Sequence, residues 1–249
     1  MPKALITGAS SGIGRAIAVK LSHMGYETVL VARRTELLEK LASVLPSRSF
    51  IVTADLTDIN ALESIVREHP DIDLLVNNAG LGVYGEFSES DFNRESNMID
   101  VNIRALHYLM KAYIPVFEKR GGGKILNVSS SAAFFSGPLL ASYYASKVYV
   151  LRLSRAVREE LRRKNSPVTI SVLCPGPVET EFGKVSGSNL GKSTLSPGFI
   201  AEKAVNGLLM GRFMIIPGFT MKLSYILSKI LPEALSVRVL YNIQKSKRK

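Results

Sequence analysis

The sequence predicts an α/β protein with a doubly wound parallel sheet of about seven strands and helices on both faces. Short runs that are almost entirely apolar alternate along the chain with longer segments in which apolar residues recur at helical spacing. A glycine-rich turn follows the first of these runs. Strands buried on both faces have such continuous apolar runs, and parallel strands need the intervening helices as crossovers.

The predicted strands are short and are separated by the predicted helices. They cover Lys3 to Thr7, Glu27 to Ala32, Ser49 to Thr53, Asp73 to Val76, Lys124 to Val128, Val168 to Leu173 and Phe213 to Ile216. The run Thr-Val-Leu-Val-Ala in the second strand is typical of a strand that is buried on both faces.

The predicted helices carry an apolar stripe, as Ile13, Ile17 and Leu21 illustrate in the first of them. Thr35 is expected to cap the second helix, because its hydroxyl can accept a hydrogen bond from the first turn. The other helices are predicted at Ile59 to Glu68, Met98 to Lys119, around Tyr143 to Leu161, and Ala201 to Leu209. No linker or internal repeat divides the chain, so we expect one domain over residues 1–218 and an extension over residues 219–249.

The extension carries much of the chain's positive charge. The formal net charge of the protein is +11, and the segment from Phe219 to Lys249 contributes 7 − 1 = +6. Its cations are Lys222, Lys229, Arg238, Lys245, Lys247, Arg248 and Lys249, against the single anion Glu233. The rest of the chain is only mildly basic, which argues against a nucleic-acid-binding surface.

Apolar residues in this extension repeat at helical spacing on both sides of Pro232. They are Leu223, Ile226, Leu227, Ile230 and Leu231, followed by Leu235, Val239, Leu240 and Ile243. The basic amphipathic pattern resembles that of helices that lie on a membrane surface. The same segment could instead cover a substrate site or join subunits.

The sequence argues against several other classes of protein. The single cysteine, Cys174, cannot form an internal disulfide and is expected in the core. His23, His69 and His107 lack metal-ligand spacing, so no metal site is expected. Neither a signal peptide nor an apolar run of roughly 18 to 20 residues is present. We therefore expect a cytoplasmic protein, with peripheral membrane contact through the extension left open.

The turn Thr7-Gly8-Ala9-Ser10-Ser11-Gly12-Ile13-Gly14 joins the first predicted strand to the first predicted helix. Glycines let the backbone turn tightly and approach a ligand closely. The helix N-terminus offers unpaired N–H groups and a positive dipole to a pyrophosphate. In this context the turn predicts a phosphate-binding site in a Rossmann-type fold.

Tyr143 and Lys147 are four residues apart, so a helix places them on one face. A phenol has a pKa of about 10, and a nearby ammonium lowers it. The pair is therefore expected to act as a tuned proton donor and acceptor.

With these motifs, nearly the whole body of the chain resembles the short-chain dehydrogenase/reductase family. The glycine pattern G-x-x-x-G-x-G, the segment Asn77-Asn78-Ala79-Gly80 and the helix residue Asn102 match that family in order. Ser130, which lies thirteen residues before Tyr143, matches the family spacing, and Lys147 completes its Y-x-x-x-K motif. The turn Pro175-Gly176-Pro177-Val178-Glu179-Thr180 matches the motif after the sixth strand. Only Tyr143, and not Tyr144, satisfies both spacings.

The resemblance implies hydride transfer between a nicotinamide and a carbonyl or alcohol carbon. Tyr143 would be the general acid or base, Lys147 would lower its pKa, and Ser130 would hold the substrate oxygen. Asn102 would organise a water molecule that links Lys147 to solvent. Residues 1–218 would then be one dinucleotide-binding and catalytic domain. The residues expected to bind the cofactor are Gly8, Ser10, Ser11, Gly12, Ile13, Gly14, Arg33, Arg34, Asp55, Leu56, Asn78, Ala79, Gly80, Tyr143, Lys147, Pro175, Gly176, Val178 and Thr180.

The end of the second predicted strand indicates NADP(H) as the cofactor. NAD-binding proteins commonly place an acid there to hold the ribose 2′-hydroxyl, whereas this chain has Ala32. Arg33 and Arg34 follow, and an arginine there can pair with a 2′-phosphate. Arg33 is the stronger candidate. Asp55 and Leu56 resemble the family's adenine-contacting pair, although they could be structural loop residues.

The predicted substrate is a hydrophobic ketone, aldehyde or secondary alcohol. Three segments would frame it, 81–86, 132–140 and 178–195, and their apolar rim consists of Phe134, Phe135, Leu139 and Phe182. These side chains could equally pack the loops. The stretch 184–196 could form a mobile lid. Two alternatives stay open, a non-catalytic NADP-binding regulator and a membrane-associated lipid-pathway reductase. By resemblance, the long helices beginning near Met98 and Ser142 would form a homodimer or homotetramer.

Overall fold

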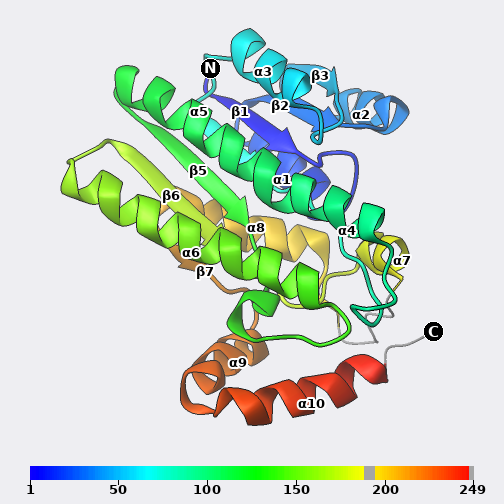
Figure 1. The fold of residues 1–249 in the computed structure, drawn as a ribbon. Helices are drawn as coiled ribbons and strands as arrows, with labels where there is room; N and C mark the ends of the chain where they lie inside the picture. Colours follow the sequence, from blue (N-terminus) through cyan, green and yellow to red (C-terminus); the bar gives the residue numbers. More distant parts are fainter. Residues whose placement is uncertain (188–193, 247–249) are drawn as a thin grey trace.

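The structure, a computed structural model, describes residues 1–187 and 194–246 and has a parallel sheet at its centre (Figure 1). Seven strands form this sheet in the order β3-β2-β1-β4-β5-β6-β7, as expected for a Rossmann-type fold. The strands are β1 (Lys3–Thr7), β2 (Glu27–Ala32), β3 (Ser49–Thr53), β4 (Leu74–Asn77), β5 (Gly123–Val128), β6 (Val168–Leu173) and β7 (Met214–Ile215). The predicted α/β architecture is therefore confirmed, with β7 shorter than predicted.

Helices connect the strands and cover both faces of the sheet. They are α1 (Gly12–His23), α2 (Thr35–Ala42), α3 (Ile59–Glu68), α4 (Phe92–Ile99), α5 (Leu106–Lys119), α6 (Ala141–Arg163), α7 (Phe182–Ser186), α8 (Pro197–Leu209), α9 (Phe219–Ile230) and α10 (Glu233–Lys245). A π-helical turn, Asp100–Ala105, joins α4 to α5, and a 3₁₀ turn, Ser131–Phe134, follows β5.

Three expectations about helix starts were wrong. The helix predicted from Ala201 begins at Pro197, because the Ser196 side chain accepts a hydrogen bond from the Phe199 N–H and caps α8. The long helical stretch predicted from Met98 begins at Phe92, because the Asp91 side chain accepts a hydrogen bond from the Arg94 N–H at 2.8 Å and caps α4. Thr35 is not a cap but the first residue of α2, and Arg34 occupies the cap position. The Thr35 hydroxyl instead pairs with the Thr53 hydroxyl at 2.7 Å, tying α2 to β3.

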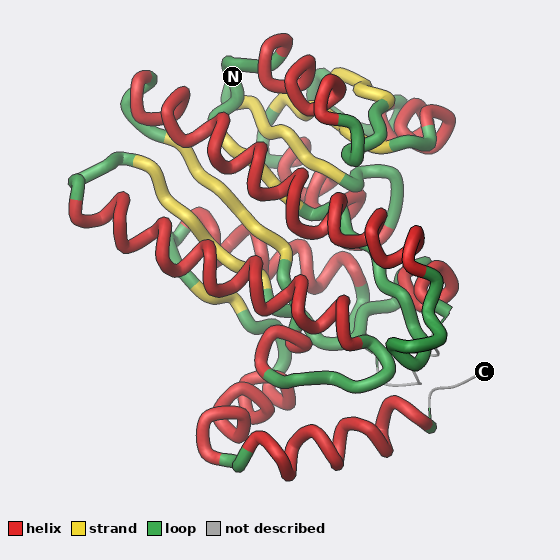
Figure 2. The backbone as a smooth tube through the Cα atoms, viewed as in Figure 1, coloured by secondary structure: helices red, strands yellow, loops and turns green. Residues whose placement is uncertain are grey.

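The apolar core lies in two layers, one on each face of the sheet, beneath the helices that Figure 2 shows around it. One layer packs the sheet against α1, α2 and α8, and the other packs it against α3, α5 and α6. Cys174 is fully buried, as expected. Because each face is covered, function must be sought at the edges where the strands end.

The order of the strands reverses between β1 and β4, and their carboxyl ends lie side by side. A short network joins the two loops there. The Thr7 hydroxyl accepts hydrogen bonds from the N–H groups of Asn78 and Ala79 at 3.0 and 3.1 Å. The Asn78 side-chain amide donates to the carbonyls of Thr7 and Gly8 at 2.9 and 3.2 Å. The loops then diverge to opposite faces of the sheet, which creates a crevice for a ligand.

Candidate active site

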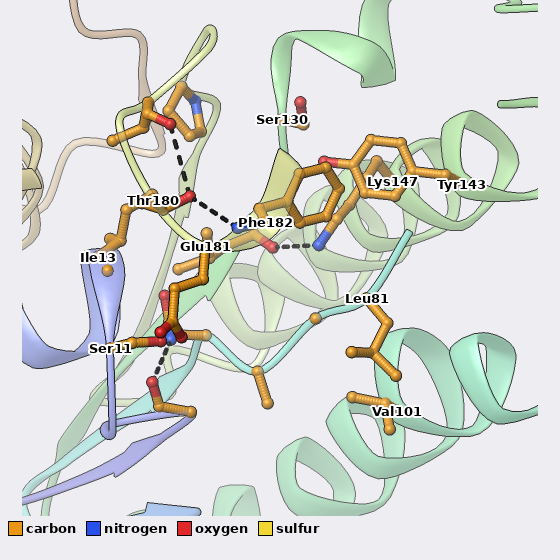
Figure 3. Close-up of a pocket in the computed structure, with 18 of the residues that line it drawn as sticks. Ser11, Ile13, Leu81, Val101, Ser130, Tyr143, Lys147, Thr180, Glu181 and Phe182 are labelled. Carbon is orange, nitrogen blue, oxygen red and sulfur yellow. Dashed lines mark hydrogen bonds between the residues drawn. The ribbon is translucent and has the colours of Figure 1, made fainter. Parts of the chain in front are cut away.

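A cavity of about 500 Å³ lies at the carboxyl ends of the strands. Figure 3 shows Tyr143, Lys147 and Phe182 converging toward one end of it, and Ser11 and Glu181 at the other. Of the predicted site residues, all line this cavity except two, Gly14 and Asn102. The lid proposed for 184–196 falls largely on 188–193, which lie outside the described residues.

The glycine-rich turn presents the start of α1 to the cavity. Gly8 and Gly12 have φ values of +67° and +56°, a conformation that other residues rarely adopt. A side chain at Gly12 would also meet the Thr180 methyl group at 2.9 Å. Within the described residues, the Ser11 side chain makes no capping hydrogen bond to α1. The first N–H groups of α1 are therefore available to an anionic ligand.

Gly14 lies behind this turn and allows its close packing. A Cβ atom there would lie 2.3 Å from the Asn78 amide nitrogen and 2.4 Å from the Gly8 carbonyl oxygen. Gly14 therefore lets α1 approach the β4 loop, which is a packing role.

The two arginines after β2 both line the cavity but have different partners. Arg34 donates hydrogen bonds to the hydroxyls of Ser10 and Ser11 at 3.2 and 3.0 Å, and to Glu181 at 2.7 Å. Arg33 makes a long ion pair with Asp55 at 3.8 Å. Hydrogen bonds from Thr57 hold the pKa of Asp55 below its ordinary value. Arg34 is thus hydrogen-bonded to the glycine-rich turn, whereas Arg33 lines the cavity with a weaker contact to its neighbour.

Tyr143 and Lys147 lie on one face of α6, as predicted from their spacing. The Lys147 ammonium nitrogen is 5.7 Å from the centre of the Tyr143 ring and donates a hydrogen bond to the Val128 carbonyl at 3.1 Å. The Tyr143 ring also packs against that of Phe182, with 5.1 Å between their centres. Ser130 follows β5, lines the same cavity and exerts an effect that lowers the pKa of the Tyr143 phenol.

The expected lowering of the Tyr143 pKa does not occur in this arrangement. Burial raises the pKa of Tyr143 to about 12, and the Ser130 side chain offsets this rise only in part. Burial also lowers the pKa of Lys147 to about 8. Lys147 sits beside the ring and is hydrogen-bonded to a backbone carbonyl, not to the phenol. At neutral pH the pair is therefore a protonated phenol beside an ammonium.

Asn102 lies in the π-helical turn and is almost completely buried. Its amide exchanges hydrogen bonds with the backbone of Leu81 at 2.8 and 3.0 Å and donates to the Ser146 hydroxyl at 3.0 Å. The π turn aims this amide between the β4 loop and α6. Asn102 thus positions the segment that faces Lys147 but does not itself line the cavity.

The substrate end of the cavity is only partly the one predicted. Leu81, Ala132 and Phe182 line it, but Phe134, Phe135 and Leu139 do not. Phe134 packs against Tyr225 of α9, with 4.9 Å between ring centres, so the packing alternative holds for this residue. Lining residues that the sequence did not single out are Ala54, Val101, Val128 and Gln244.

Gln244 of α10 completes this wall from the far end of the chain. Its side-chain amide donates a hydrogen bond to the Tyr144 hydroxyl at 2.7 Å, and its backbone carbonyl accepts one from Tyr84 at 2.8 Å. Glu233 accepts a hydrogen bond from Ser136 at 2.6 Å at the other end of α10. The extension therefore covers the substrate end, one of the alternatives left open by the sequence.

These features define a class of protein, an oxidoreductase that uses a nicotinamide dinucleotide. Three features fit a bound dinucleotide: the uncapped start of α1, the positive-φ glycines and a cavity of a size typical of ligand sites. The turn after β1 would hold the pyrophosphate of the dinucleotide. Tyr143 and Lys147 lie at the opposite end of the cavity.

Comparison with known proteins places the chain in a family. A model of the short chain dehydrogenase family matches residues 2–190. An uncharacterized oxidoreductase of Staphylococcus epidermidis is 32% identical over 210 residues, which cover 82% of this chain and 90% of that protein. The chain belongs to the short-chain dehydrogenase/reductase family and is an oxidoreductase that uses NAD(P).

Two solved structures share the fold over most of their length. A short-chain dehydrogenase from Sphingobium yanoikuyae in complex with NADPH superposes with a TM-score of 0.85, at 28% identity and 95% coverage of both chains. A family member from Burkholderia phymatum in complex with NAD has a TM-score of 0.84 at 24% identity, covering 91% of this chain and 92% of its own. These proteins bind different cofactors, so the cofactor of this chain must be argued from its own residues.

Proposed function

We propose that this protein is an NADP(H)-dependent reductase of hydrophobic ketones or aldehydes, with Tyr143 as the proton donor. The observation that carries the proposal is that Tyr143, Lys147 and Ser130 line one cavity, with the Lys147 ammonium nitrogen 5.7 Å from the centre of the Tyr143 ring. Burial holds the pKa of Tyr143 well above neutral pH, so the phenol keeps its proton there. A phenol that holds its proton is suited to donate one to a developing alkoxide. When bound, the reduced cofactor supplies the hydride.

Ser130 and Lys147 support this proton transfer in different ways. The Ser130 hydroxyl, at the end of β5, would hold the carbonyl oxygen of the substrate against the Tyr143 hydroxyl. As Tyr143 gives up its proton, negative charge develops on the phenol oxygen. The ammonium of Lys147, fixed by the Val128 carbonyl, stabilises that charge in a site with little water.

The preference for NADP(H) rests on the residues that follow β2. Ala32 cannot accept a hydrogen bond from a ribose hydroxyl, and Arg33 borders the cavity next to it. Among the residues that the structure describes, the Arg33 guanidinium has only a long ion pair, with Asp55, to give up. A 2′-phosphate would provide closer charge-assisted hydrogen bonds. Arg34, by contrast, is held by Ser10, Ser11 and Glu181 and would support the pyrophosphate turn.

The apolar nature of the substrate rests on the walls near Tyr143. Beside the polar Tyr144 and Gln244, the apolar side chains there are those of Leu81, Val101, Ala132, Leu140 and Phe182. None of these can pair with a phosphate or with several sugar hydroxyls. A ketone with an apolar body would therefore lose little solvation free energy when it leaves water for this site.

A substrate panel tests the proposal. The full-length protein would be assayed with NADPH against aliphatic ketones, aldehydes, 3-oxoacyl thioesters and steroids, by following the loss of NADPH absorbance. We expect turnover of one or more apolar carbonyl compounds, with a higher kcat/KM for NADPH than for NADH. A protein that binds NADPH tightly but turns over none of the four classes would instead be a dinucleotide-binding regulator.

A further inference from the structure

The outer surface of α9 carries large apolar side chains, whereas its inner surface combines Met221 and Tyr225 with two serines. Within the described residues, α9 buries no side chain completely, and the half-buried ones that face the body are Met221, Ser224, Tyr225 and Ser228. Large apolar side chains point away instead: Phe219, Leu223, Ile226, Leu227 and Ile230. Phe219 and Ile230 are 81% and 73% exposed. This is the reverse of an ordinary surface helix, which turns its apolar stripe to the core.

Helix α10 also turns apolar side chains outward and polar ones inward. Its two buried side chains, Ser236 and Gln244, are polar. The outward positions Leu235, Val239 and Ile243 are four residues apart and about half exposed. These side chains and those of α9 make up the outer face of the α9–α10 hairpin, and the hairpin lies below the sheet in Figure 1. Apolar side chains gathered in this way mark an interaction surface.

Cations flank this apolar surface on both helices. Lys222 and Lys229 are seven residues apart on one side of the α9 stripe, and Arg238 and Lys245 have the same spacing on α10. The described part of the hairpin thus carries 4 − 1 = +3, and its only anion, Glu233, is hydrogen-bonded inward to Ser136. The remaining cations of the extension, Lys247, Arg248 and Lys249, lie outside the described residues.

We propose that the outer face of the α9–α10 hairpin docks on the surface of a bilayer that contains anionic phospholipids. The apolar stripe would enter the boundary between headgroups and acyl chains, and the flanking cations would meet lipid phosphates and carboxylates. No helix in the described part of the chain is long and apolar enough to cross a membrane. The contact would therefore be peripheral.

A second copy of the chain fits this surface less well. A symmetric contact would place the same patch on both subunits and bring Lys222, Lys229 and Arg238 of each chain toward those of the other. Within the described hairpin the single carboxylate, that of Glu233, is already hydrogen-bonded to Ser136. An anionic lipid surface satisfies both the apolar and the basic parts of the hairpin.

The inner face of the same hairpin borders the catalytic cavity. Gln244 lines the cavity, and Met221 closely contacts Gly176, which also lines it. A docked protein would thus hold the cavity about one helix diameter, roughly 10 Å, from the lipid. If the protein is the reductase proposed above, this short distance would favour apolar substrates that partition into membranes.

Vesicle co-sedimentation of the full-length protein tests the proposal without any substrate, so its failure is distinct from failure of the proposed reductase activity. The probes are vesicles of phosphatidylcholine alone and of phosphatidylcholine with about one-third phosphatidylserine. The wild-type protein should bind the mixed vesicles several-fold better, and added salt should weaken binding. The variant Ile226→Glu/Ile230→Glu should lose at least about tenfold of the binding. Lys222→Gln/Lys229→Gln should reduce the preference for the anionic vesicles.

Val44→Glu/Ile59→Glu is the matched control, because these aliphatic residues are also exposed but lie far from the hairpin in the sequence. It should bind vesicles as the wild type does, and circular dichroism should show that all variants remain folded. Equal binding by wild type and Ile226→Glu/Ile230→Glu, or no binding by the wild type, would overturn the proposal. A failure to bind, together with a smaller mass of Ile226→Glu/Ile230→Glu in analytical ultracentrifugation, would show that the face joins two copies instead.

Discussion

The turn after β1 and the wall contributed by α10 border the same cavity but are built in opposite ways. The turn is local: Gly8, Ser11 and Gly12 lie within a few residues, and backbone conformation alone creates their site. The wall is assembled from distant segments, as when Gln244 reaches Tyr144 across 100 positions. One end thus depends on backbone geometry and the other on tertiary packing.

This contrast suggests how the two ends can change. The cofactor end tolerates little, because a side chain at Gly8 or Gly12 would clash and adopt an unfavourable φ. At the other end, Leu81, Phe182 and Gln244 each come from a different loop or helix, and none has unusual backbone geometry. We therefore expect substitutions to alter catalysis at the junction of the two ends, cofactor choice at one end and substrate affinity at the other.

The largest effect is expected at the junction, for Tyr143→Phe. Removing the proton donor should lower kcat about 10²- to 10⁴-fold, while NADPH affinity stays within a few-fold. Steady-state kinetics and NADPH fluorescence titration measure the two quantities. Tyr144→Phe is the matched control, because it removes the neighbouring hydroxyl and should retain most of the rate. A Tyr143→Phe enzyme with near wild-type kcat would disprove the assignment.

A stability measurement at the same junction should show the next largest effect. Burial lowers the pKa of Lys147 from 10.5 to about 8, so between these pH values the unfolded chain binds more protons than the folded one. The free energy of unfolding should therefore rise with pH over this window because of Lys147, by on the order of 3 kcal/mol. Lys147→Met keeps the length of the side chain and should lack this rise.

Urea unfolding of wild type and Lys147→Met at several pH values measures the difference between the two proteins, in which other titrating groups cancel. The difference should be constant below about pH 7 and should shift in favour of the wild type as the pH approaches 10. Parallel pH profiles for the two proteins would show that Lys147 is not desolvated in the folded state.

Cofactor choice should respond to Arg33→Ala at the other side of the cavity. Loss of a charge-assisted contact with the 2′-phosphate should lower kcat/KM for NADPH about tenfold or more, with little change for NADH. Arg34→Ala, which disturbs Ser10 and Ser11, should weaken both cofactors alike. If Arg34→Ala alone abolishes the preference for NADPH, the 2′-phosphate contact belongs to Arg34.

The fold and the conformation of the turn after β1 were predictable because local patterns determine them. The apolar runs gave the strands, and the spacing of Tyr143 and Lys147 placed both on one face of α6. The start of α4 at Phe92 was missed because a single capping side chain, Asp91, decides it. The raised pKa of Tyr143 was missed because it depends on burial, which spacing does not reveal.

The inward direction of Gln244 was equally hidden. Helical spacing in the extension shows an apolar stripe, and the usual rule turns such a stripe toward the core. Here the stripe faces outward, and the polar residues Ser236 and Gln244 are the buried ones. Only the packing of α10 against Tyr144 and Ser136 reveals this orientation.

The smallest effect, and the one that tests the contrast most finely, is expected for Gln244→Leu. Within the described residues the Gln244 side-chain oxygen is buried without a hydrogen-bond partner, whereas its amide nitrogen binds Tyr144. Leucine removes both the unpaired acceptor and this hydrogen bond, so stability should change by no more than about 1 kcal/mol.

The KM for an apolar ketone should change a few-fold in Gln244→Leu, because the wall near Tyr144 is altered, while NADPH affinity should not change. Asn242→Leu is the matched control, since Asn242 is an exposed amide on the same helix, and it should leave both quantities unchanged. Should Gln244→Leu shift NADPH affinity as much as the KM for the ketone, α10 would not act as a substrate wall. The two ends of the cavity would then be coupled through α6, which carries Tyr143, Tyr144 and Lys147 together.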